Sequence, residues 1–133
     1  MTSVRPIFQT TTRRTPATRV LVVDDTPSRH RRFEKILSST GHKQVRHAFT
    51  AQEAITALGH SVLAEHLFEM VCLDHDLGTF DDGRTVASWM VENYPKSTRV
   101  LVHSQNPVGA QAIFDILMEG GFKDIVISPY KSA

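Results

Sequence analysis

The sequence predicts an α/β fold, a doubly wound, five-stranded parallel sheet in one domain. Five short runs of branched apolar residues alternate along the chain with longer segments in which apolar residues recur at helical spacing. Such strands are typical of a parallel sheet covered on both faces, and right-handed crossovers through helices join them. With 133 residues, 41% of them hydrophobic, the chain can bury a core. We therefore expect one domain over residues 19–133, preceded by a tail of residues 1–18.

The expected strands are residues 20–23, 45–49, 70–73, 99–103 and 125–127. Capping residues mark the helices between them: Thr26 before Pro27, a capping box from Thr50 to Glu53, Asp82, and Asn106 before Pro107. The helix after Pro27 should present Phe33, Ile36 and Leu37 to the core and end at Gly41.

The composition excludes several classes of protein. The formal net charge is +1, which gives no general electrostatic argument for nucleic-acid binding, although three arginines in the flexible basic tail leave a binding arm open. No apolar stretch approaches the ~18 residues of a membrane span. The single cysteine, Cys72, lies in an apolar run, so it has no internal disulfide partner and is expected in the core. A cytoplasmic location is expected.

Polar clusters follow three of the expected strands. Asp24 and Asp25 follow the first, residues 74–76 (Asp-His-Asp) follow the third, and residues 103–106 (His-Ser-Gln-Asn) end the fourth. In an open parallel sheet, ligands bind beyond the carboxyl ends of the strands, so these clusters should converge at one edge. Carboxylates packed that closely need a cation, a shared proton or open solvent. The sequence therefore predicts a functional site there.

These motifs resemble the receiver domain of response regulators. The likeness rests on VLVVDD before a helix that begins with proline, on Leu73-Asp74 with Asp82-Gly83 eight residues later, and on a hydroxyl residue near the end of the fourth strand. The resemblance implies a flavodoxin-like fold, a magnesium ion on Asp24, Asp25, Asp74 and the carbonyl of Asp76, and a partner protein. It also implies that Asp74 accepts a phosphoryl group.

The chain departs from the receiver pattern at four places, one of which is Gly78, in a loop where receivers usually have proline. His103 stands where receivers have Thr or Ser, with Ser104 one residue later, and Ser128 stands where a lysine precedes proline. We expect the closing helix of the family to be missing, because only three residues follow Tyr130 in this sequence. LDHDLG and VHSQNPVGA are similar to an atypical group, the cyclic-phosphate-processing receiver domains. That resemblance implies an enzyme that hydrolyses a cyclic phosphate ester.

The residue chemistry leaves two functions open, a phosphoesterase and a signalling module that is either phosphorylated on Asp74 or degenerate. Carboxylates suit Mg²⁺, and imidazole at His103 would widen the choice to Mn²⁺. For the enzyme we expect His103, Asp74 and His75 to be catalytic, and Ser104, Asn106 and Ser128 to bind phosphate. Two imidazoles acting without metal are an alternative, and whether His75 faces the edge or the sheet is open. The remaining histidines are expected on the surface without a role: His30, His42, His47, His60 and His66.

The missing last helix also bears on assembly. Parallel sheets bury both faces, and without this helix one flank of the sheet is left uncovered. Either the tail, through Ile7 and Phe8, or a second subunit should cover it, and we favour a homodimer.

Overall fold

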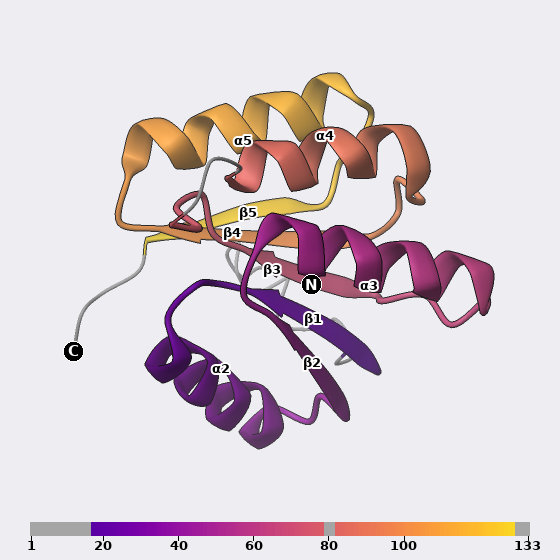
Figure 1. Cartoon of the computed structure of the whole chain (residues 1–133), viewed down its shortest axis with the longest axis vertical. Helices are drawn as coiled ribbons and strands as arrows, with labels where there is room; N and C mark the ends of the chain where they lie inside the picture. The colour runs from indigo at the N-terminus through magenta and orange to yellow at the C-terminus, as the bar shows by residue number, and fades with distance from the viewer. Residues whose placement is uncertain (1–16, 79–81, 130–133) are drawn as a thin grey trace, which may run out of the picture.

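The computed structural model describes residues 17–78 and 82–129 and confirms the predicted fold. Five parallel strands form one sheet in the order β2-β1-β3-β4-β5, as Figure 1 shows. The strands are β1 (Arg19–Val23), β2 (Gln44–Ala48), β3 (Met70–Leu73), β4 (Arg99–Ser104) and β5 (Ile125–Pro129). The helices are α2 (Pro27–Ser39), α3 (Ala51–Leu63), α4 (Gly83–Asn93) and α5 (Pro107–Glu119).

The helices cover the two faces of the sheet unequally (Figure 1). One face packs against α3, α4 and α5 around Leu58, Met90 and Ile113, which form a large core with the strand residues. Among the described helices, only α2 packs against the other face, through Leu37 and Phe33. The strands between are buried on both faces, which explains why their sequences are continuously apolar rather than alternating.

Most helix starts follow the capping residues predicted from the sequence. The side chains of Thr50, Asp82 and Asn106 accept hydrogen bonds from backbone N–H groups of the first turns of α3, α4 and α5. Thr26 precedes α2 but its side chain makes no cap hydrogen bond; its hydroxyl donates to Asp25 instead.

The buried stripe of α2 differs from the expected one. Ile36 is 51% exposed, whereas His30 and Leu37 are buried and Phe33 packs against the core. The inward face therefore runs through residues 30, 33 and 37, and it includes a histidine that the sequence analysis placed on the surface.

Residues 17 and 18, which the prediction assigned to the tail, are held by the domain. Ala17 is buried and its N–H donates to Nδ1 of His42, while the N–H of Thr18 donates to Glu69. The rest of the predicted tail, including Ile7 and Phe8, lies outside the described residues. In the part of the chain that the structure describes, no helix is long and apolar enough to cross a membrane.

The described chain ends with β5, as expected for a fold without its last helix. Leu101 and Val126 are register partners in β4 and β5. Leu101 packs at the margin of the core under α2, whereas Val126 is 44% exposed. The face of the sheet beside α2 therefore remains partly open over β5.

Candidate functional site

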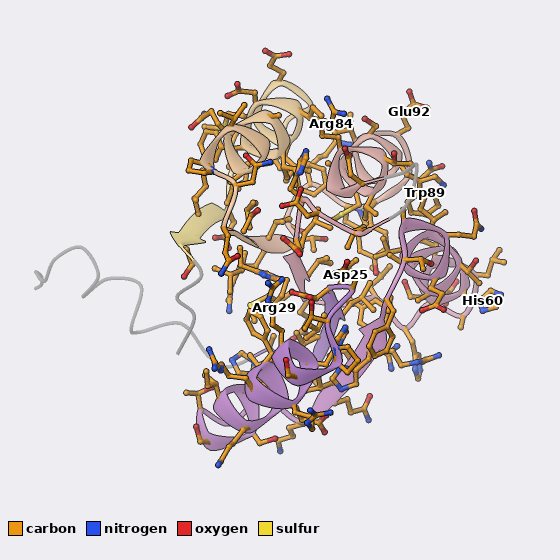
Figure 2. The ribbon with its side chains drawn as sticks, turned by 60° about the vertical axis from the view of Figure 1, so that its left-hand side comes forward. Asp25, Arg29, His60, Arg84, Trp89 and Glu92 are labelled. Atoms are coloured by element: carbon orange, nitrogen blue, oxygen red, sulfur yellow. The ribbon has the colours of Figure 1, made fainter. Side chains whose placement is uncertain are left out.

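Three carboxylates meet at the carboxyl edge of the sheet. Asp24 and Asp25 follow β1, Asp74 follows β3, and ligand oxygens of all three lie within 4.8 Å of one another. The cause is strand pairing, because Val23 and Leu73 are register partners and the residues after them must emerge together. Figure 2 labels Asp25 beside the start of α2. The structure thus brings together three of the four predicted metal-binding residues.

Two of these carboxylates are buried. Asp24 is 0% exposed and Asp74 is 1% exposed, and within residues 17–78 and 82–129 Oδ2 of each lacks a hydrogen-bond partner. Burial raises the pKa of Asp74 to about 7, and the neighbouring charge of Asp24 adds to the rise. Burial also raises the pKa of Asp24, although the N–H of Thr26, which donates to its Oδ1, and the charge of Arg29 oppose the rise. Desolvation, more than mutual repulsion, is therefore what disfavours the charged forms.

Arg29, in the first turn of α2, connects the two buried acids. Its Nη1 lies 3.5 Å from Oδ1 of Asp24 and 3.5 Å from Oδ2 of Asp74. The sequence analysis missed this residue, because an arginine near a helix start usually faces solvent. The available signal was its position four residues after the acid pair, which places it in the helical turn next to the edge.

His30 supports the same cluster from behind and was also missed. Its Nε2 lies 2.6 Å from the carbonyl oxygen of Asp24, and its Nδ1 lies 2.7 Å from Nδ1 of His47, whose Nε2 lies 2.6 Å from a carboxylate oxygen of Glu34. Burial lowers the pKa of His30, which favours its uncharged form.

His103 lies against the acid cluster on the face covered by α2. Its Nδ1 is 3.7 Å from Oδ2 of Asp24, and its ring packs 4.5 Å from that of Phe33. The side chain is 2% exposed, and Nε2 has no hydrogen-bond partner. Burial lowers the pKa of His103 to about 4, with a further contribution from the charge of Arg29. At neutral pH the imidazole is therefore uncharged, with a lone pair on one ring nitrogen.

His75 lies on the side of α4 and α5. Its Nδ1 is 2.8 Å from Asp76 and its Nε2 is 3.5 Å from Asp82, the residue that caps α4. Among the described residues, its ion-pair partners are these two acids and not Asp24 or Asp74. The ring rests against Gly109 in α5, where a Cβ would lie 2.4 Å from it. His75 therefore occupies the junction between β3, α4 and α5, and Asp76 turns its carboxylate toward His75.

Of the three predicted phosphate-binding residues, Ser104 ends β4, Asn106 follows it, and Ser128 lies on the neighbouring strand β5. Ser104 accepts a hydrogen bond from the N–H of Asn106, and Asn106 in turn caps α5 by accepting from the N–H of Gly109. Ser128 is the register partner of His103 on β5. Ser104 and Asn106 thus build the turn that leads into α5, and their phosphate-binding roles stay predictions.

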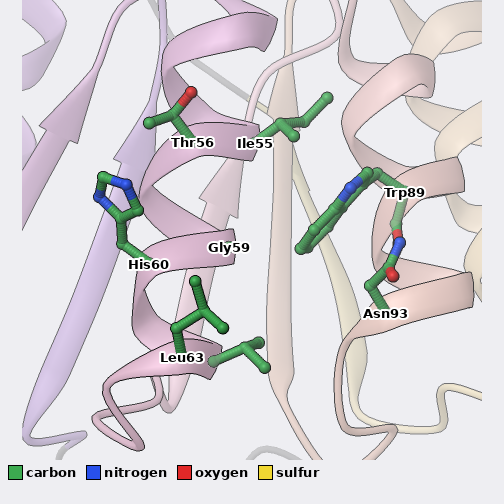
Figure 3. Close-up of a pocket in the computed structure, with 8 residues that line it drawn as sticks. Ile55, Thr56, Gly59, His60, Leu63, Trp89 and Asn93 are labelled. Carbon is green, nitrogen blue, oxygen red and sulfur yellow. The ribbon is translucent and has the colours of Figure 1, made fainter.

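A separate groove lies between α3 and α4, shown in Figure 3. It has a volume of about 450 Å³ and contains no acidic or basic residue other than one histidine; its lining is Ile55, Thr56, Gly59, His60, Val62, Leu63, Trp89 and Asn93. Because the helices run opposite to the strands, its residues toward the ends of α3 and α4 lie away from the carboxyl edge. The groove therefore does not belong to the acidic site.

The buried groups predict how stability depends on pH when metal is absent. The pKa of Asp74 rises from 3.8 to about 7 on folding, so its contribution is fully present below pH 3.8 and is lost as the pH rises through about 7. The pKa of His103 falls from 6.5 to about 4, so its contribution is fully present above pH 6.5 and is lost as the pH falls through about 4. The two effects oppose each other between these limits.

The effect should reach roughly 4 kcal/mol for Asp74 and roughly 3 kcal/mol for His103, because a ten-fold change in proton affinity corresponds to about 1.4 kcal/mol. Urea unfolding with a chelator present should show that Asp74→Asn gains stability as the pH rises from 4 to 6.5, while His103→Asn loses stability over the same range. A pH profile that is the same in both variants would contradict these assignments.

The comparisons with known proteins agree with this geometry. The family model described as the cyclic-phosphate processing receiver domain matches residues 19–119, from the start of β1 to the end of α5. A comparison with curated proteins finds no match.

Several solved structures share the fold. A phosphorylated cyanobacterial phytochrome response regulator has a TM-score of 0.68 and 21% identity over 87% of this chain and 81% of its own. CheY, solved with CheX, BeF₃ and Mg from Borrelia burgdorferi, has a TM-score of 0.66 and 24% identity over 85% and 79%. The receiver domain of a histidine kinase from Arabidopsis thaliana, with Mg²⁺ and BeF₃⁻, has a TM-score of 0.62 and 17% identity over 83% and 80%.

At these identities the solved structures establish the fold alone, whereas the family match spans most of the chain and includes all three carboxylates of the cluster. The chain belongs to the family of cyclic-phosphate processing receiver domains.

Proposed function

We propose that this domain binds a divalent cation at Asp24, Asp25 and Asp74 and hydrolyses a cyclic phosphate ester there. The observation that carries the proposal is a pair of buried carboxylate oxygens in a cluster of three acids, Oδ2 of Asp24 and Oδ2 of Asp74, that have no hydrogen-bond partner among the described residues. Buried polar atoms are almost always satisfied, so two exceptions at one edge point to a ligand.

The donor set fits a hard cation. Three carboxylates favour Mg²⁺ or Mn²⁺, and the exposed Asp25 leaves the outer side of the cluster open to water and substrate. His103 lies beside Asp24 as a neutral imidazole, which would favour Mn²⁺ if it joined the ligands. The backbone carbonyl of Asp76 is the fourth proposed contact.

A bound cation would polarise a phosphoryl oxygen and make a coordinated water more acidic. His103, uncharged at neutral pH, can accept a proton from the attacking water and return it to the departing oxygen. One P–O bond forms, one ring P–O bond breaks, and the product is a phosphate monoester with one water added. The first turn of α5, with Ser104 and Asn106, and Ser128 on β5 would bind the phosphoryl oxygens.

The second candidate is a phosphorylated signalling module. Asp74 directly follows β3 in a fold shared with receivers solved with Mg²⁺ and BeF₃⁻ or with a phosphorylated aspartate. Under this alternative Asp74 is the phosphoacceptor, the cation site is the same, and the partner is a protein. Attack by Asp74 requires a charged carboxylate, which a cation at the cluster would favour by lowering its raised pKa.

The enzyme proposal predicts that His103→Ala lowers the hydrolysis of a 2′,3′-cyclic nucleotide by roughly 10²- to 10⁴-fold, the usual contribution of a general acid or base. Asp74→Asn should be as damaging, because it removes a metal ligand. The measurement is product formation with Mg²⁺ or Mn²⁺ across a panel of cyclic phosphates. His60→Ala, in the groove between α3 and α4, is the matched control and should retain full activity.

Acetyl phosphate separates the two candidates. Labelling of Asp74 by acetyl phosphate, together with no turnover of any cyclic phosphate, would reject the enzyme and support the signalling module.

The proposed cation site predicts that Mg²⁺ or Mn²⁺ stabilises the protein, by about 2.7 kcal/mol at a metal concentration 100 times Kd. Asp25→Asn and Asp74→Asn should each lower metal affinity by roughly ten-fold or more, since affinity depends on the number of charged ligands. Calorimetric titration is the measurement. Trp89 lies in the separate groove, so we do not expect its fluorescence to report on the cation site. Asp115→Asn, an exposed aspartate of α5, is the control. Binding that survives in Asp74→Asn would place the metal elsewhere.

The partly open face of the sheet predicts a homodimer. A second copy placed on β4 and β5 would cover Val126, which is 44% exposed on the part of this sheet face that α2 does not cover. Sedimentation should show mass increasing with concentration for the wild type and a monomer for Val126→Glu. A monomer at all concentrations would reject the dimer. In that case a chain that begins at Ala17 provides the next test, and a loss of stability in this shorter chain would show that the residues before Ala17 cover the face instead.

A further inference from the structure

The cation nearest to the acid cluster belongs to the chain itself. The guanidinium of Arg29 lies between the carboxylates of Asp24 and Asp74, at 3.5 Å from an oxygen of each. Its side chain is 22% exposed, whereas the two acids are buried. Figure 2 shows Arg29 at the start of α2, beside Asp25. Arg29 therefore joins the two buried acids to the protein surface.

The contact has the features of a replaceable charge. A guanidinium that forms charge-assisted hydrogen bonds to carboxylates stands at about 2.7–2.9 Å from them, so two contacts of 3.5 Å represent electrostatic attraction without strong hydrogen bonds. Oδ2 of Asp74 remains without a hydrogen bond although Arg29 faces it. A divalent cation that binds this oxygen would meet the positive charge of Arg29 directly and repel it.

A displaced Arg29 would stay at the edge, because its backbone is fixed in the first turn of α2. Ser128, the register partner of His103, provides no charge there. A phosphoryl group at the edge carries negative charge on several oxygens, and guanidinium matches this geometry with two parallel N–H donors. The same side chain can therefore neutralise the acids before the metal arrives and the phosphoryl group afterwards.

We propose that Arg29 is a tethered counter-cation of the acid cluster, that a divalent metal displaces it from Asp24 and Asp74, and that the released guanidinium then binds the phosphoryl group of the substrate. The inference rests on the cation site of the proposed function and adds the anion-binding residue of that site. Arg29 thus couples the two ligands: it opposes metal binding and favours phosphate binding.

The first test is calorimetric titration of the full chain with Mg²⁺ or Mn²⁺. Arg29→Gln should bind the metal at least about ten-fold more tightly than the wild type does. A neighbouring cation changes the proton affinity of a carboxylate by about 10- to 1000-fold, and we expect an effect of this kind on its affinity for a metal cation. Arg31→Gln removes the same charge from an exposed position two residues later on α2 and is the matched control, with affinity close to that of the wild type.

The second test titrates inorganic phosphate into the same proteins at saturating metal. Arg29→Gln should bind phosphate about ten-fold more weakly, the loss of a charge-assisted pair, while Arg31→Gln should not change. Arg29→Lys keeps the charge but loses the planar pair of donors, so its metal affinity should stay near that of the wild type while its phosphate affinity falls. This variant also keeps the test valid if Arg29→Gln proves too unstable to titrate.

The outcomes separate the two proposals. If metal binds the wild type and Arg29→Gln equally, the displacement is rejected while the cation site stands. If metal binds neither, the cation site and the role of Arg29 both fail. If phosphate affinity is unchanged in both Arg29 variants, the guanidinium does not bind the phosphoryl group, and the inference is overturned.

Discussion

The arrangement of the site depends on one constraint, the burial of two carboxylates at the ends of neighbouring strands. Asp24 and Asp74 follow β1 and β3, whose register brings their oxygens together, and both are almost completely excluded from water. A buried charge is costly unless it is paired, so the surrounding residues are arranged to reduce that cost. Arg29 supplies a positive charge, the N–H of Thr26 donates to Asp24, and His30 holds its backbone carbonyl. These contacts do not restore ordinary pKa values, because the pKa of both carboxyl groups remains raised.

Two glycines allow the helices to start close to this cluster. A Cβ on Gly83 would lie 2.3 Å from the carbonyl oxygen of Asp74, and one on Gly109 would lie 2.4 Å from the ring of His75. Side chains at these positions would push α4 and α5 away from the end of β3. Steric fit therefore explains why glycine stands after Asp82 and in the NPVGA motif. This explanation is independent of any catalytic role. The same packing links His75 to the helix starts and not to the acids.

The fold and the acid cluster could be predicted because they depend on local patterns and on the parallel sheet. Apolar runs and capping residues defined the elements, and parallel strands must end at the same edge. Arg29 and His30 could not be predicted from residue type, because helix rotation decides which polar side chains of a first turn face inward. The apolar residues of α2 suggested a buried stripe through Ile36. The observed stripe contains His30, Phe33 and Leu37, whose spacing of three and four residues places them on one face of the helix. The sequence did not determine which face of the sheet His75 lies on, because the regular alternation of side chains between the two faces ends with β3.

The placement of the two histidines also bears on the chemistry. His103 packs against Phe33 of α2, and His75 packs against Gly109 of α5, which covers the opposite face of the sheet. An acid–base pair of imidazoles must reach one phosphate from two sides, and here the end of β3 lies between the two rings. His103 is neutral beside Asp24, whereas His75 lies between two other acids, Asp76 and Asp82. This separation favours a site in which a cation on the acid cluster, and not a second imidazole, supplies the positive charge opposite His103.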